Sequence, residues 1–311
     1  MTFRVGEEIR EALERGAGAV ALETSVIGQG LPHPRNLECI DRMSGAIRAA
    51  GSVPAWIGVI DGILTVGLTG AELGRFARPG AATKVARRDY PMAVATRALG
   101  ATTVSATIWA AAEAGIEVGA TGGIGGVHPG DDPDVSADLL ELARTPGMLV
   151  CSGPKSIIDP LATAEKLEEL GVAIVGYGVD RLPFFLAREA PIELEHRVDG
   201  SVEAAALARS AAALETPSTI LLCNPVPEAH AMDADEVAAA AHEAERRADA
   251  AGAHGKARTP FLLAALAELT DGRSLEANLA LLEDNARVAG EVAAAAVASA
   301  ATGARSSRSP S

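Results

Sequence analysis

The sequence predicts an α/β protein, a three-layer α/β/α sandwich with a mixed, mostly parallel central sheet and a helical C-terminal third. Short apolar runs alternate with amphipathic helical segments over most of the chain, which is typical of parallel strands covered on both faces. One hairpin signal interrupts this alternation, so we expect a mixed sheet. From Asp233 onward the periodicity is nearly all helical, which predicts the helical C-terminal third.

The individual elements follow from apolar runs and helical periodicity. Strands are expected at 17–23, 53–60, 63–68, 116–121, 148–154, 172–178 and 219–224, and helices at 5–16, 36–51, 69–78, 101–115 and 156–170. Asp61-Gly62 between two apolar runs is the clearest signal, because this pair favours a two-residue hairpin turn. Asn36 is expected to cap the helix that begins there.

Length and composition indicate one domain at 1–301, followed by a disordered polar tail at 302–311. The net charge of -14 and pI near 4.9 argue against nucleic acid as a partner, since phosphate binding needs a basic face. No apolar run reaches the roughly 18 residues of a membrane span, and we expect no signal peptide. The widely spaced cysteines Cys39, Cys151 and Cys223 are expected to be buried thiols in the cytoplasm.

The segment from Thr121 to Asp159 is the densest candidate for a site. Its glycine run 122–126 either brings backbone N–H groups to an anion or forms a flexible exit from a strand. The run is not a Rossmann dinucleotide-binding fingerprint, because no helical segment follows it directly. The acids that follow can be read in two ways. Asp134 and Asp138, one turn apart around Ser136, suit Mg²⁺ or Mn²⁺ with His128 nearby, or they cap a helix whose dipole they complement.

Lys155 follows the apolar run MLVCSGP, so we expect it at the carboxyl end of a strand, where α/β sheets bind ligands. Only four of the 27 basic residues are lysines, and only an amine can form an imine. Lys155 is therefore a candidate nucleophile, although a structural lysine is equally compatible with the local pattern. Lys166 lies on the polar face of a helix and is expected to be ordinary.

Other candidates lie outside that segment. Glu23 ends a strand beside a glycine and proline loop, so it is either a general acid or base or a structural carboxylate. Lys84 with its neighbours Arg87 and Arg88 forms a basic patch that suits a phosphate or is a solvated face. Asn278 and Asn285 share one helix face, and spacing alone favours a solvated stripe over a polar seam.

These residues lie in phrases that resemble one family, the pseudouridine-5'-phosphate glycosidases, also called indigoidine synthase A-like. The similar phrases are ALETSVIGQGLPHPRNLE, IGVIDGILTVGL, KVARRD, GATTVSAT, TGGIGGVHPG, DVSADLLELARTP, GPKSIID, IVGYG, NPVPE, GKARTPFLL and GRSLEANLALLEDNA. They span roughly Ala21 to Ala286 in the family's order. The resemblance implies a C-glycosidase, classed also as a hydro-lyase, which reversibly splits pseudouridine 5'-phosphate into uracil and ribose 5-phosphate. It also implies a divalent metal, usually Mn²⁺, and a homotrimer.

The resemblance assigns the site residue by residue. Glu23 takes the proton-donor position, Lys155 the nucleophile position and Asp134 the metal-ligand position. The implied substrate-binding residues are Lys84, Val104, Thr121, His128, Ser136, Ala137, Asp138 and Asn278.

A carbon–carbon glycosidic bond offers no basic leaving-group oxygen, so a pair of carboxylates suits it poorly. An imine offers another route. Glu23 helps to open the ribose, Lys155 forms an imine at C1', and the bond to uracil C5 breaks as that imine forms. The lysine amine must be neutral to attack. Burial, or the positive charge of nearby Lys84 or of the metal, would favour the neutral form by lowering the lysine pKa. The alternatives are a class I aldolase-like lyase and a sugar-phosphate-binding protein without catalysis.

Overall fold

The central feature of the molecule is a sheet whose carboxyl edge lies next to the helical C-terminal third. A computed structural model describes residues 2–130, 134–253, 255 and 258–306. Within these residues, 11 strands form one mixed sheet with the order β1-β4-β3-β2-β7-β8-β11-β9-β10, and β6 joins β3 to β5. All neighbouring pairs from β3 through β2 to β10 are parallel, whereas β4 and β6 run antiparallel to β3. The predicted mixed, mostly parallel sheet is confirmed.

The strands are short and mostly buried, as strands covered on two faces are. Their bounds are β1 Phe3–Val5, β2 Ala19–Glu23, β3 Val53–Ile60, β4 Ile63–Val66, β5 Thr83–Val85, β6 Gly100–Thr102, β7 Val118–Ala120, β8 Gly147–Cys151, β9 Ile174–Tyr177, β10 His196–Val198 and β11 Thr219–Cys223.

Helices connect the strands and make up the end of the chain. Their bounds are α1 Glu7–Glu14, α2 Arg35–Ala49, α3 Gly70–Phe76, α4 Tyr90–Ala95, α5 Val104–Glu113, α6 Ala137–Leu142, α7 Pro160–Glu169, α8 Ser201–Ala213, α9 Ala234–Ala250, α10 Arg258–Leu269 and α11 Arg273–Ser306. Among the described residues, no helix combines the length and the apolar character that crossing a membrane requires.

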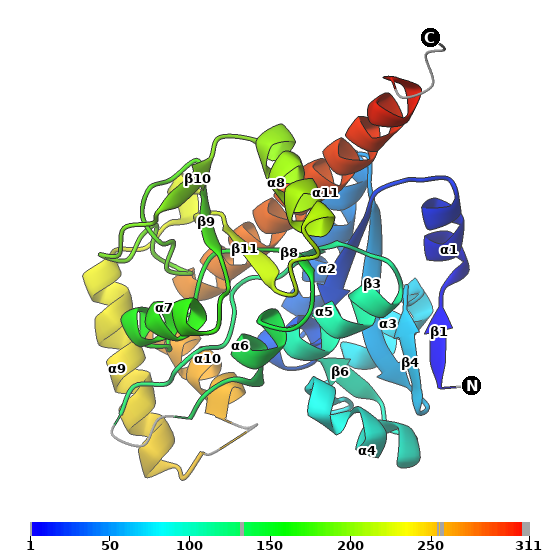
Figure 1. Cartoon of the computed structure of the whole chain (residues 1–311). Coiled ribbons are helices and arrows are strands. Elements are labelled where there is room, and N and C mark those ends of the chain that lie inside the picture. Colours follow the sequence, from blue (N-terminus) through cyan, green and yellow to red (C-terminus); the bar gives the residue numbers. More distant parts are fainter. Residues whose placement is uncertain (1, 131–133, 254, 256–257, 307–311) are drawn as a thin grey trace.

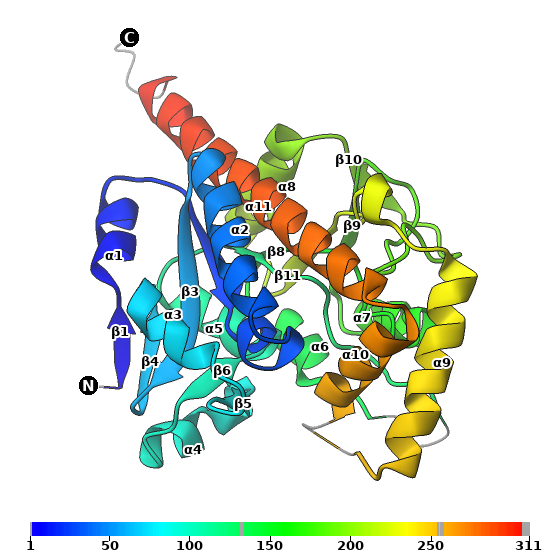
Figure 2. The ribbon, with the colours of Figure 1, turned by 180° about the vertical axis from the view of Figure 1, so that it is seen from behind.

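The helices cover the sheet on both faces (Figures 1 and 2). Alternate residues of each strand point to opposite faces, so Val20 and Leu22 of β2 pack with α2, α3, α8 and α11. Ala19 and Ala21 of the same strand pack on the other face with α1, α4 and α5, where α6 and α7 cover β8 and β11. This arrangement is the predicted three-layer sandwich.

The hairpin predicted at Asp61-Gly62 is present between β3 and β4. Both turn residues have positive φ angles, 52° for Asp61 and 81° for Gly62, as the two central residues of a type I′ turn require. A β-carbon at Gly62 would lie 2.7 Å from the carbonyl oxygen of Val94. Glycine is therefore required there for its conformation and for its lack of a side chain.

Two local predictions need correction. Asn36 is not the N-cap of α2, because the helix begins at Arg35. Asn36 is instead buried, and its Nδ2 donates to the carbonyl oxygens of Ile27 and Ala77. The last helix, α11, continues to Ser306, past the predicted start of the tail at 302, since an established helix gains one hydrogen bond with each added residue. Residues 307–311 of the predicted tail lie outside the described residues.

We predict that Gly62→Ala lowers the free energy of unfolding by about 3 kcal/mol, because it combines a left-handed backbone with a clash. The matched control is Gly16→Ala, where φ is 65° and a β-carbon meets no heavy atom within 4 Å. That variant should lose only about 1 kcal/mol. Urea unfolding measures both, and equal losses would show that the contact with Val94 is unimportant.

Candidate active site

The site lies where neighbouring parallel strands end together. Strands β2, β7, β8 and β11 are adjacent and parallel, so their carboxyl ends meet at one edge of the sheet. Strand β2 ends at Glu23, opposite Ile57 of β3. The next residue of β3, Gly58, pairs instead with Ala101 of β6. The ends of β2, β6, β7 and β8 therefore surround one space.

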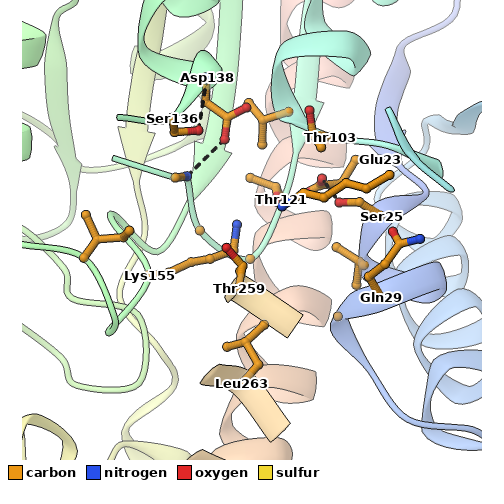
Figure 3. A pocket seen from close by; sticks show the side chains of 18 of the residues that line it. Glu23, Ser25, Gln29, Thr103, Thr121, Ser136, Asp138, Lys155, Thr259 and Leu263 are labelled. Atoms are coloured by element: carbon orange, nitrogen blue, oxygen red, sulfur yellow. Dashed lines mark hydrogen bonds between the residues drawn. The ribbon is translucent and has the colours of Figure 1, made fainter. Parts of the chain in front are cut away.

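That space is a cavity of about 220 Å³. It collects side chains from both halves of the chain (Figure 3). Every residue that the sequence analysis assigned to the site lines it: Glu23, Lys84, Val104, Thr121, His128, Asp134, Ser136, Ala137, Asp138, Lys155 and Asn278. The structure thus brings the predicted residues together, while their individual roles stay predictions.

Glu23 is a buried acid held by two hydroxyl groups. It is 4% exposed, and its carboxylate accepts hydrogen bonds from Ser25 Oγ and Thr121 Oγ1. Burial raises the pKa of Glu23, while the charge of Lys155 and the two hydroxyl groups oppose that rise and Asp138 adds to it. A raised pKa favours the protonated acid, which is the form a proton donor needs.

Lys155 is fixed by the pairing of two loops. The chain after β7 and the chain after β8 continue the parallel register, with Ser152 N donating to Gly122 O (2.7 Å) and Ile124 N to Gly153 O (3.1 Å). Lys155 N then donates to Ile124 O at 3.1 Å. This pairing places the Lys155 side chain in the cavity, just beyond the end of β8 as predicted.

The glycine run owes its composition to close packing. A β-carbon at Gly125 would lie 2.4 Å from Ser136 Oγ, and one at Gly126 would lie 2.3 Å from Thr163 Oγ1. The Gly125 N–H already donates to Asp138 Oδ2 at 3.1 Å. This amide therefore serves the loop's own structure, and close packing excludes a side chain at Gly125 and Gly126.

The acidic residues divide into a structural part and an accessible part. Ser136 caps α6 by accepting from Asp138 N (3.2 Å), and the buried Asp138 carboxylate also accepts from Ser105 N at 2.9 Å, at the start of α5. Asp134 is exposed at the cavity wall, so it is the carboxylate that could reach a cation. Among the described residues, no group of three or more His, Cys, Asp or Glu side chains is placed to hold a metal. Asp131 and Asp132 are not among the described residues.

The basic patch also divides. Lys84 and Arg88 line the cavity, beside the first residues of α5. Arg87 instead forms an ion pair with the buried Glu141 and lies 5.0 Å from the ring centre of Trp109. Burial lowers the pKa of Lys84, and the charge of Lys155 lowers it further, while nearby carboxylates oppose the shift. The two cavity lysines are thus close enough for their charges to interact.

His128 lies between the cavity and α9. Its Nδ1 is 3.8 Å from Glu245 Oε1, and Glu245 is also paired with Arg258. Burial lowers the pKa of His128, against the opposing charges of Glu245 and Asp134. A neutral imidazole is therefore favoured at this wall of the cavity.

The asparagines on α11 form a polar seam, so the solvated stripe that spacing favoured is wrong. Asn285 is completely buried, and its Nδ2 donates to Thr121 O (2.8 Å) and Ser152 Oγ (3.0 Å). Its Oδ1 accepts from Asn224 Nδ2 at 3.0 Å. Asn278, two turns earlier on the helix, lines the cavity.

The sequence analysis missed part of the wall. The missed lining residues include Gln29, Thr103, Phe185, Thr259 and Leu263. Gln29 lies in a π-helical turn, Val26–Gly30, directly after β2. Such turns are frequent at functional sites, but an isolated turn leaves no periodic signal, and the position of the segment after Glu23 was its only sequence clue.

The fold and site together define an α/β enzyme-like protein with a buried carboxyl group and a half-buried lysine lining one cavity at strand ends. The chain belongs to the family described as indigoidine synthase A like protein, whose model matches residues 8–295. A relative from Symbiobacterium thermophilum, named pseudouridine-5'-phosphate glycosidase, is 48% identical over 294 residues, covering 93% of this chain and 96% of the relative.

Two solved structures share the fold. An indigoidine synthase A-like protein from Thermotoga maritima has a TM-score of 0.87 and 38% identity, over 94% of this chain and 96% of that one. The prealnumycin C-glycosynthase AlnA, in complex with ribulose 5-phosphate, has a TM-score of 0.88 and 41% identity, over 97% of this chain and 99% of that one.

The raised pKa of Glu23 predicts a pH-dependent stability. At pH values between the ordinary glutamate pKa of 4.5 and the higher pKa of Glu23 in the folded protein, the native protein binds more protons than the unfolded chain. The free energy of unfolding therefore falls through this window as pH rises. Glu23→Gln removes the titrating group, so the stability of the variant relative to the wild type should increase from about pH 4.5 upward.

Urea unfolding at several pH values measures this difference. Glu14→Gln, at an exposed carboxylate of α1, is the control and should show no such trend. A constant difference for Glu23→Gln across the window would contradict the proposed protonation of the buried acid.

Proposed function

We propose that this protein is a pseudouridine-5'-phosphate glycosidase that reversibly cleaves the C–C bond between uracil and ribose 5-phosphate through a lysine imine. The observation that carries the proposal is that the buried Glu23 and the half-buried Lys155 line one cavity, where the charge of Lys155 counteracts the rise in the Glu23 pKa. The name of the Symbiobacterium relative and the sugar phosphate bound to AlnA support the same substrate class.

The 5'-phosphate fits the basic end of the cavity. Lys84 and Arg88 line this end together with Thr103 and Val104 at the start of α5. A helix N-terminus presents backbone N–H groups and a partial positive charge to an anion. The protein as a whole carries a charge of -14, so this local positive field is what draws an anionic ligand into the cavity.

The reacting carbon then lies between Glu23 and Lys155. Glu23 donates its proton to the ring oxygen as the ribose opens, and the neutral Lys155 amine bonds to C1'. The proton that the Lys155 nitrogen gives up after its attack returns to Glu23. When the C1'–C5 bond breaks, its electron pair stays with uracil C5, which takes this proton from Glu23, while the nitrogen lone pair forms the iminium. Water then adds at C1', which releases ribose 5-phosphate and the free amine.

Mn²⁺ is proposed as the cofactor, with Asp134 as its ligand. The carboxylate of Asp134 is exposed at the cavity wall and is a ligand type that hard divalent cations prefer, so Asp134 would hold the ion. The bound ion would supply positive charge to an anionic substrate. We further propose a cytoplasmic homotrimer; the buried, unpaired thiols of Cys39, Cys151 and Cys223 fit a reducing compartment.

Lys155→Ala should lower turnover of pseudouridine 5'-phosphate by about 10³-fold or more, because the variant lacks the amine that forms the imine. Lys166→Ala is the matched control, since Lys166 lies on α7 and pairs with Glu169 at 2.9 Å, and it should retain nearly normal activity. Uracil release followed by chromatography measures both. Similar activities in the two variants would remove Lys155 from the mechanism.

Removal of divalent metal should abolish turnover, and added Mn²⁺ should restore it. Asp134→Asn should weaken the response by raising the Mn²⁺ concentration needed for half-maximal activity, because an amide is a poorer ligand than a carboxylate. Steady-state rates across a metal titration test both expectations. Full activity in excess chelator would refute the metal requirement.

A further inference from the structure

A second cavity of about 400 Å³ borders the active-site cavity. The two cavities share the wall residues Gln29, Gly30, Phe185, Pro260, Leu263 and Asn278. Beyond this shared wall the second cavity is lined mainly by apolar residues of the segments 28–32 and 77–79, of α10 and of the start of α11. It therefore suits a ligand group with apolar faces and few polar atoms.

The shared wall and Lys155 line the same cavity. In Figure 3, Thr103 and Asp138 lie above Lys155 and Leu263 lies below it, whereas Gln29 lies level with Lys155, beside Ser25 and Glu23. A substrate whose C1' lies at Lys155 therefore has this wall available for its remaining group. For a C-nucleotide, that group is the base.

Gln29 has a fixed orientation at this wall. Its Nε2 donates to the carbonyl oxygen of Ala82 at 2.9 Å. This bond identifies which end of the side-chain amide is the nitrogen, because a flipped amide would place Oε1 against the Ala82 oxygen. The Oε1 atom is buried and has no hydrogen-bond partner among the described residues. A buried acceptor without a partner costs free energy, which a ligand donor would recover.

We propose that Gln29 is a specificity-determining residue, whose Oε1 accepts a hydrogen bond from a ring N–H of the nucleobase at the wall between the two cavities. The inference rests on the proposed function and extends it to the base. A C5-linked uracil keeps N–H groups at both N1 and N3, and these are its only hydrogen-bond donors. Phe185 and Leu263 supply apolar contact for the planar ring, and the second cavity gives room at its outer edge.

Gln29→Met tests the hydrogen bond, because methionine keeps the length and removes the acceptor together with the Nε2 donor to Ala82. Calorimetry with uracil, in the presence of ribose 5-phosphate, should show about tenfold weaker binding than in the wild type, the loss expected for one hydrogen bond. The KM for ribose 5-phosphate in the synthetic direction should stay unchanged. Equal uracil affinity in both proteins, or no uracil binding by the wild type, would overturn the proposal.

Ala264→Trp tests the location, because Ala264 is exposed on α10 and lines the second cavity. The bulky ring should weaken uracil binding and leave ribose 5-phosphate binding intact. Ala212→Trp, at an exposed position of α8 outside both cavities, is the control. Unchanged uracil binding in Ala264→Trp would place the base elsewhere. A wild type that binds uracil through Gln29 but does not cleave pseudouridine 5'-phosphate would refute the proposed function alone.

Discussion

The site depends on one buried amide, that of Asn285. Its Nδ2 donates to Thr121 O beyond β7 and to Ser152 Oγ beyond β8, and its Oδ1 accepts from Asn224 beyond β11. Each group is completely or almost completely buried, so each bond left unmade would cost about 1–3 kcal/mol. A single helix side chain thereby fixes the ends of three parallel strands relative to one another.

The catalytic candidates are attached to this junction. Thr121, whose carbonyl oxygen binds Asn285, uses its hydroxyl group to hold Glu23. Ser152 pairs with Gly122, and the same ladder ends at Lys155. The acid and the amine thus come from different strands but share one rigid support, which is what positioning within a fraction of an ångström requires. Burial then biases the protonation of Glu23 and Lys84 toward their neutral forms.

Features with a local physical cause could be predicted from the sequence. Asp61-Gly62 specifies its own turn, and Lys155 was identified because lysine is rare in this chain and follows an apolar run. Features set by distant contacts could not. Arg87 turns away from its basic neighbours toward Glu141, which is far along the chain. Asn36 and Asn285 are buried by tertiary packing, which helical spacing cannot reveal, and the unpartnered oxygen of Gln29 appears only once Ala82 is placed beside its amide.

The central claim is that Lys155 forms an imine with the sugar phosphate. Borohydride reduction of the wild-type protein with ribose 5-phosphate, followed by intact mass and peptide mapping, tests it most directly. The account predicts one stable adduct per chain, located on Lys155. An adduct on Lys84 instead, or no adduct in a protein that still binds ribose 5-phosphate, would contradict it.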